Sequence, residues 1–201
     1  MNFNKLISYI IHPIVIPIIG TIIYFMILPK HTTKQMELLV ITSVFIGTYV
    51  IPLFFLLTLK SSKVIASLHL ENTQERKFPI MFFISISFLI STLLKKIPSI
   101  MELSLFFYGM TLSLVVVYLL LYLKFKASLH MIGICGLLGF IIFFSYEFQI
   151  NLLLFIAFLF LLAGFIASSR LKLKAHNLKE IYWGALIGII CEFVVYAIYS
   201  I

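Results

Sequence analysis

Residues 150–168 read INLLLFIAFLFLLAGFIAS, an apolar run that contains no charged side chain. A helix rises about 1.5 Å per residue, so a run of this length crosses the hydrocarbon layer of a bilayer, which is about 30 Å thick. Backbone polar groups must be satisfied internally in lipid, and the run lacks the alternation of a barrel strand. The stretch therefore predicts a membrane-spanning helix.

Similar runs fill the rest of the 201-residue chain, which is 63% hydrophobic and only 11% charged. A soluble domain is roughly 25% charged. No polar stretch is long enough to fold separately, so we expect a single domain over residues 1–201. The predicted fold class is all-α, a polytopic integral membrane bundle of six to seven transmembrane helices. The seven candidate spans are 6–29, 37–59, 79–94, 100–123, 130–146, 150–168 and 181–200.

The segments between the spans are basic. With seven spans, the N-terminus and the second, fourth and sixth loops share one face, and the positive-inside rule assigns the more basic face to the cytoplasm. The net charge of +8 then reflects loop orientation and anionic lipid, so membrane lipids are expected partners and nucleic acid is not. That first face has eleven cations against four on the other: Lys5, Lys60, Lys63, Arg76, Lys77, Lys124, Lys126, Arg170, Lys172, Lys174 and Lys179, against Lys30, Lys34, Lys95 and Lys96.

The same basic face gathers the rarer polar residues of the chain. Both arginines, Arg76 and Arg170, lie there, and so do three of the five histidines, His69, His130 and His176. Arginine binds phosphate oxygens through two parallel hydrogen bonds, which lysine cannot form. The alternative is that both arginines are interfacial cations whose charged ends reach the water. The convergence predicts one anion pocket at the edge of the bilayer.

The most specific motif runs from Ser169 to Glu180. If a helix begins over residues 176–180, His176 and Glu180 stand one turn apart on the same face. The carboxylate then holds one ring N–H, and the other ring nitrogen is free to act as a nucleophile. Arg170 is suited to stabilise a phosphoryl group. The alternative is a solvated loop with a His–Glu pair on its surface.

Two further motifs precede helices. Ser128 is predicted as an N-cap, and His130 in the following turn is placed to protonate a leaving oxygen at an anion site formed by the helix N-terminus. Arg76 and Lys77 precede Pro79, which is suited to open a helix. These two cations serve either as phosphate clamps or as a solvated helix cap.

Together the three motifs resemble the phosphatidic acid phosphatase type 2 superfamily, whose signatures are K-x6-R-P, P-S-G-H and S-R-x5-H-x3-D. The similarity covers residues 60–201. The third signature is matched by Ser169, Arg170 and His176, with Glu180 in place of aspartate. The second is matched by Ser128 and His130, with Ala127 and Leu129 in place of proline and glycine. The first is matched by Arg76 and Pro79, with His69 in the place of lysine.

The chain is also similar to a divergent bacterial branch of small membrane proteins. The shared features are a His-Pro pair near the start, a Ser-x-His-x-x-Gly motif and a final Arg-Leu-x-Leu-x-Ala-His motif followed by Tyr-x-Gly-x3-Gly. In this chain they are His12 and Pro13; Ser128, His130 and Gly133; and Arg170, Leu171, Leu173, Ala175, His176, Tyr182, Gly184 and Gly188.

The resemblance implies a metal-independent, two-step hydrolysis of a lipid phosphate monoester or diphosphate, without a cofactor. His176 attacks phosphorus, His130 protonates the leaving group and Glu180 orients His176. Two histidines in opposite protonation states give a bell-shaped pH profile. The phosphate is held by Arg170, Arg76, Lys77, Ser128 and Ser169. The expected location is the bacterial inner membrane. The family works on its outer face whereas the loop charges point to the cytoplasm, so the side of the site stays open.

Two other functions remain open. One is a catalytically inactive family member that binds lipid or assists assembly. The other is a proton-coupled carrier, because ionisable residues within membrane spans, here Glu192 and His12, are usually functional. A magnesium-dependent prenyl-transferring enzyme is disfavoured, because the chain contains no aspartate.

Overall fold

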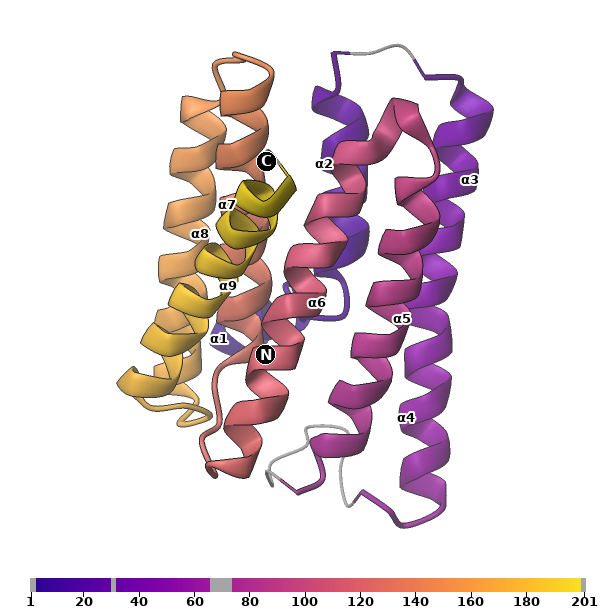
Figure 1. Cartoon of the computed structure of the whole chain (residues 1–201). Helices are drawn as coiled ribbons and strands as arrows, with labels where there is room; N and C mark the ends of the chain where they lie inside the picture. The colour runs from indigo at the N-terminus through magenta and orange to yellow at the C-terminus, as the bar shows by residue number, and fades with distance from the viewer. Residues whose placement is uncertain (1–2, 30–31, 66–73, 200–201) are drawn as a thin grey trace.

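The structure is a computed structural model that describes residues 3–29, 32–65 and 74–199. Every regular element in these ranges is helical (Figure 1). The elements are α1 (Phe3–Ile10), α2 (Ile16–Ile27), α3 (Lys34–Phe45), the π-helical η1 (Ile46–Val50), α4 (Ile51–Ser61), α5 (Lys77–Lys95), the 3-10 helix η2 (Pro98–Ile100), α6 (Met101–Tyr122), α7 (Leu129–Glu147), α8 (Leu153–Lys172) and α9 (Leu178–Tyr199). Six helices are long and apolar enough to cross a membrane, which confirms the predicted class.

The second predicted span, 37–59, is a continuous helix from Lys34 to Ser61 that contains the π-helical turn η1. Pro52 lies two residues after this turn, at the start of α4. Proline has no backbone N–H to donate and its ring crowds the preceding turn, and a widened turn accommodates both effects. Thr48 lies within the widened turn, where its hydroxyl donates to the carbonyl of Val44 at 2.9 Å. The helix therefore continues across the proline.

The prediction of a single helix over residues 6–29 is wrong. The chain turns between α1 and α2, and the N–H of Val15 donates to the carbonyl of His12 at 2.8 Å. Pro13 lies in this turn and Pro17 in the first turn of α2, where a missing N–H is harmless. α2 has 12 residues and is therefore about 18 Å long, too short to cross a bilayer. The described chain thus has six long spans rather than seven.

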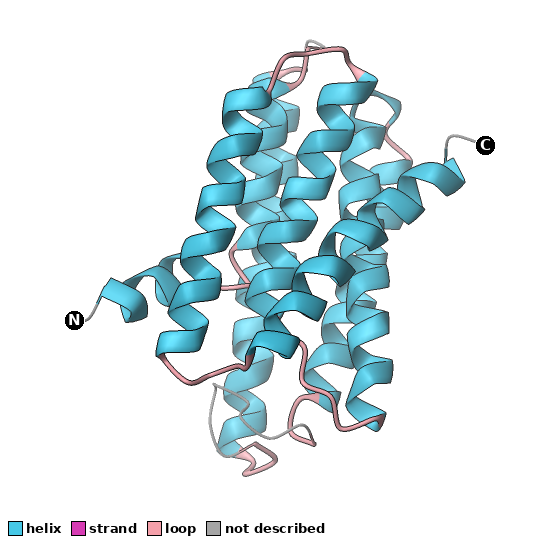
Figure 2. Cartoon of the chain, turned by 90° about the vertical axis from the view of Figure 1, so that its left-hand side faces the viewer, coloured by secondary structure: helices cyan, strands magenta, loops and turns pink. Residues whose placement is uncertain are grey.

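The helix α7 is the centre of the bundle. Its apolar window is 72% buried, against 22% for that of α8. The helix α9 crosses the bundle obliquely (Figure 2) and packs closely on α7 through glycines. A Cβ atom on Gly188 would lie 2.6 Å from the carbonyl oxygen of Ile132, and one on Gly184 would lie 2.8 Å from that of Ser128. The absence of these side chains brings the start of α9 against the start of α7.

The loops divide between the two ends of the bundle. The loops after α6 and α8, the end of α4 and the start of α5 all lie at the lower end in Figure 1. The loops after α5 and α7, the end of α2 and the start of α3 lie at the upper end. The described motifs of the basic face therefore meet at one end of the molecule, as the alternation of spans predicts.

Candidate active site

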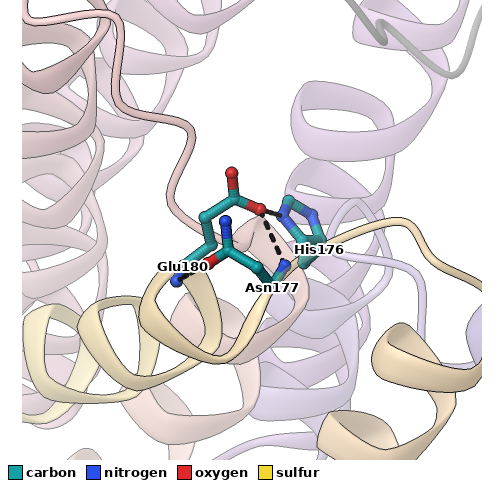
Figure 3. A network of polar contacts seen from close by, with 3 residues as sticks. All are labelled: His176, Asn177 and Glu180. Atoms are coloured by element: carbon teal, nitrogen blue, oxygen red, sulfur yellow. Dashed lines mark hydrogen bonds and ion pairs between the residues drawn. The ribbon is translucent and has the colours of Figure 1, made fainter.

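The best-defined part of the site is a pair formed by His176 and Glu180 at the start of α9 (Figure 3). His176 Nδ1 lies 2.8 Å from Glu180 Oε2. The same oxygen accepts the backbone N–H of Asn177 at 3.2 Å, and the Asn177 side chain accepts the N–H of Glu180 at 2.9 Å. These reciprocal bonds form a capping box. Glu180 therefore fixes both the helix start and the histidine ring.

His176 lies just before α9, which begins at Leu178, and not within the first turn of a helix as predicted. It is buried, and burial lowers its pKa to about 4; the Glu180 hydrogen bond raises the pKa, and the charges of Arg170 and Arg76 lower it. The imidazole is therefore neutral at neutral pH. Because the Glu180 oxygen accepts the Nδ1–H, the lone pair is on Nε2.

The second histidine, His130, lies in the first turn of α7, two residues after the N-cap residue Ser128. Its Nε2–H donates to the carbonyl of Ser8 at 3.2 Å, and its ring centre lies 5.5 Å from that of His12. The N–H of Ser128 donates to the carbonyl of Glu180 at 3.1 Å. The Ser128 hydroxyl makes no capping bond, although the residue occupies the predicted cap position. A backbone bond thus joins the two histidine motifs.

Ser169 and Arg170 lie in the last turn of α8 and not in the loop to which the sequence assigned them. Arg170 Nη1 donates to Ser8 Oγ at 3.4 Å. The buried hydroxyl of Ser169 donates to the carbonyl of Asn4 at 3.0 Å. Ser169 therefore contacts α1, while Arg170 also lies within electrostatic range of His130.

Arg76 is only 6% exposed at the start of α5. Burial lowers its pKa to about 10, the charge of Glu180 raises it, and that of Arg170 lowers it. The neighbouring Lys77 places its ammonium 4.4 Å from the centre of the Tyr122 ring, a contact with α6 rather than with the histidines. His69 lies outside the described residues.

The described structure thus connects five of the predicted residues through electrostatic interactions. Arg170 interacts with His130, His176 and Arg76. Glu180 interacts with His176 and Arg76. Two guanidinium groups face one carboxylate, so the group has an excess of positive charge. Such a group is suited to receive an anion.

Three contributors from the N-terminal segment were not among the predicted site residues. Asn4 contacts Ser169, Ser8 contacts His130 and Arg170, and His12 contacts His130. Asn4, Ser8 and His12 are spaced by four residues within an apolar run, which is the signal of a polar stripe on one helix face. These residues were missed because one continuous span was expected over residues 6–29. In such a span, successive turns of the helix would lie progressively further from the basic loops.

A cavity of about 310 Å³ is at the opposite end of the bundle, where α6 begins and α7 and α9 end. Its polar lining includes two carboxylates, which do not suit a phosphate. Within the described ranges, no three histidine, cysteine or glutamate side chains gather to hold a metal ion. The cavity is lined by Met101, Glu102, Leu105, Phe143, Glu147, Tyr196 and Tyr199.

In comparisons with known proteins, no family model, no curated protein and no solved structure matches the chain.

Proposed function

We propose that the protein is an integral-membrane phosphatase, which hydrolyses a lipid phosphate monoester or diphosphate through a phosphohistidine intermediate. The observation that carries the proposal is a pair of unused donors. Within the described residues, Arg170 Nε and Ser128 Oγ are buried without a hydrogen-bond partner. A buried donor without a partner is costly, and a phosphate oxygen would satisfy it. These donors belong to the two motifs that carry the histidines.

In the first step, the lone pair on His176 Nε2 forms a bond to phosphorus. The phosphorus–oxygen bond to the leaving group breaks, and His130, which is charged in the complex with the anionic substrate, gives one proton to the departing oxygen and becomes neutral. The ring of His176 becomes positively charged, and Glu180, which accepts the Nδ1–H, stabilises that charge. Arg76 and Arg170 stabilise the negative charge on the other phosphoryl oxygens.

In the second step, a water molecule attacks phosphorus and gives its proton to His130. The phosphorus–nitrogen bond breaks, inorganic phosphate leaves, and His176 returns to its neutral form. His130 thus alternates between acid and base, so no net proton is consumed at the site.

The proposed substrate is a lipid, because the site lies where membrane-spanning helices end. His130 is in the first turn of α7, and Arg170 is in the last turn of α8. A phosphate bound there can leave its acyl or prenyl chains in the hydrocarbon layer. The resemblance to the phosphatase superfamily supports a bacterial inner membrane as the location.

The test uses the purified full chain in liposomes that contain phosphatidic acid or a polyprenyl diphosphate. We expect the wild type to release phosphate, and His176→Ala to release none and to carry no phosphate on protein. His130→Ala should release phosphate at least about a hundredfold more slowly than the wild type, because both steps lose the group that transfers their proton. Glu147→Gln, at the opposite end, is the control. Undiminished release by His176→Ala would refute the mechanism.

A second candidate function is lipid-phosphate binding without hydrolysis. One observation favours it: the carbonyl of Ser8 accepts the hydrogen bond of the proposed acid, His130, and its hydroxyl accepts from Arg170. In this case, wild-type protein binds phosphatidic acid with an affinity that falls in Arg170→Ala, yet releases no phosphate. Measuring binding and release on the same liposomes separates the two functions.

A further inference from the structure

Glu192 is an isolated carboxyl group in the interior of the bundle. It lies well inside the membrane span of α9, which runs from Leu178 to Tyr199, and its side chain is only 4% exposed. Within the described residues, its Oε1 atom has no hydrogen-bond partner. An ordinary packing role does not require a carboxyl group here, because leucine or glutamine would fill similar space.

The neighbouring helices leave room for this carboxyl group. A Cβ atom on Gly109 of α6 would overlap it. On α7, a Cβ atom on Gly136 would lie 3.7 Å from Glu192 Oε1, and one on Gly139 would lie 3.2 Å from Glu192 Cβ. Three glycines on two helices therefore form a slot around one acidic side chain.

A cavity of about 20 Å³ lies beside the carboxyl group. One water molecule needs about 10–15 Å³ by this kind of measure, so the cavity has room for about one. Its lining includes the hydroxyl-bearing Ser113 of α6. The rest of the lining is Pro13, Ile16, Phe106, Met110, Ile132, Gly133 and Gly136.

None of the residues that line the cavity, apart from Glu192, has an ionisable side chain. The α6 wall offers a serine hydroxyl, the α7 wall offers glycines and isoleucine, and the turn before α2 offers Pro13. The thiol of Cys191 on α9 lies within electrostatic range of Glu192 and forms a hydrogen bond with Ser113. No lining cation is therefore available to neutralise an ionised carboxylate.

An ionised carboxylate without a cation is very unfavourable in such surroundings, whereas the neutral acid can donate one hydrogen bond. We propose that Glu192 and the cavity beside it form a proton-binding site, in which the carboxyl group holds a proton and one water molecule connects it to Ser113. The site is distinct from the phosphate site and does not depend on hydrolysis. Its ligand is the proton, and loss of that proton would place a charge between α6, α7 and α9.

The test is infrared difference spectroscopy on the full chain in liposomes at neutral pH. A protonated carboxyl group has a C=O stretching band that a carboxylate lacks. We expect this band in the wild type and its loss in Glu192→Gln, which has nearly the same shape. Transfer to deuterated water should shift the band, because the carboxyl proton of Glu192 exchanges with the water molecule in the cavity. The matched control is Glu147→Gln, which changes a glutamate at the C-terminal end of α7. This variant should leave the band unchanged.

A second variant keeps the carboxyl group but removes its slot. In Gly109→Ala, the added methyl group displaces the Glu192 side chain, so the frequency of the band should change. The proposal is overturned if the wild type shows no acid band that Glu192→Gln removes. It is also overturned if the band is the same in Gly109→Ala and in the wild type.

Discussion

At the scale of single residues, Glu180 combines a structural and a chemical task. One oxygen of its carboxylate accepts both the ring N–H of His176 and the backbone N–H of Asn177. The helix cap and the orientation of the proposed nucleophile therefore depend on the same atom.

Two substitutions separate the tasks of Glu180. Glu180→Gln keeps an oxygen that can accept the Asn177 N–H but loses the charge that stabilises His176. We expect phosphate release to fall about a hundredfold or more, with little change in thermal stability. Glu180→Ala should lose the cap as well, at a cost of about 1 kcal/mol in the free energy of unfolding. Phosphate release and thermal unfolding of both variants test this, and equal melting temperatures would contradict the structural task.

The pKa of His176 gives stability a defined pH dependence. The pKa falls from 6.5 to about 4 in the folded chain, chiefly through burial. Between these values the unfolded chain binds a proton that the folded chain does not, so the stability contributed by His176 is lost as the pH falls. We expect the wild type to lose more thermal stability between pH 6.5 and 4 than His176→Gln. An equal fall in melting temperature of the two proteins between pH 6.5 and 4 would contradict a buried neutral imidazole at position 176.

The residues of the candidate site were predictable to different degrees. His130, His176, Arg76, Arg170 and Glu180 follow from motif spacing, and the described structure brings them together. The predicted phosphate contact of Lys77 does not appear in the structure, because its ammonium group lies over the ring of Tyr122 instead. Motif spacing does not reveal which neighbour a long side chain will contact. The contacts of Asn4 and Ser8 with the site were not predicted, because they depend on where α1 packs.

At the scale of elements, the packing of α9 on α7 sets the geometry of the site. Gly188→Ala would place a methyl group against the backbone of α7, 2.6 Å from Ile132 O and 2.9 Å from Gly136 N. Backbone cannot rotate aside, so we expect a loss of about 1–3 kcal/mol in stability and a loss of hydrolysis.

The matched control for Gly188→Ala is Gly164→Ala on α8, where an added Cβ meets nothing within 4 Å. Alanine is about 1 kcal/mol better than glycine in a helix interior, so this variant should be slightly more stable. Thermal unfolding of both proteins decides the point. An equal effect of the two substitutions would mean that close helix packing is not the cause.

The short helix α1 covers the site from the side. Its Asn4 and Ser8 face the site, whereas Leu6 and Ile10 are exposed on its other side. The paired change Asn4→Cys and Ser169→Cys should allow a disulfide that ties α1 to α8, because Ser169 Oγ lies 3.4 Å from Asn4 Oδ1. Ser8 is the hydrogen-bond partner of His130 and Arg170, so a phosphate that binds both residues must displace it. A disulfide that holds α1 in place should then lower phosphate release, and a reducing agent should restore it.

The controls for this crosslink are the two single cysteine variants under the same oxidation and reduction. The native cysteines, Cys135 and Cys191, are buried and separate from this contact. Full activity of the oxidised double variant would show that α1 does not have to move.

The helices were predictable where the length of an apolar run determines them, and not where a proline determines whether the helix continues. Six spans follow from runs of about 20 apolar residues, and their observed ends lie within a few residues of prediction. The first run failed as a single helix because hydropathy does not distinguish a proline that begins a helix from one that interrupts it. Pro52 lies inside a continuous helix, whereas Pro13 lies in a turn. Local packing decides between these outcomes.

At the scale of the whole molecule, the charges of the basic end predict how the bundle is oriented in the membrane. The positive-inside rule predicts that this end faces the cytoplasm. We expect Ser62→Cys, exposed after α4, to resist a membrane-impermeant maleimide added outside intact cells, and Asn151→Cys, exposed between α7 and α8, to react. Buried native cysteines keep the background low. The reverse pattern would place the site on the outer side, as the resemblance to the phosphatase superfamily implies.

The location of the histidines at the helix ends has a consequence for how such a catalyst would meet its substrate. A lipid that never leaves the leaflet reaches the protein by lateral diffusion, so the search is two-dimensional. The relevant concentration is then the mole fraction of substrate among the surrounding lipids and not its amount per volume of buffer. Turnover would respond to the composition of the membrane even when the total quantity of lipid stays constant.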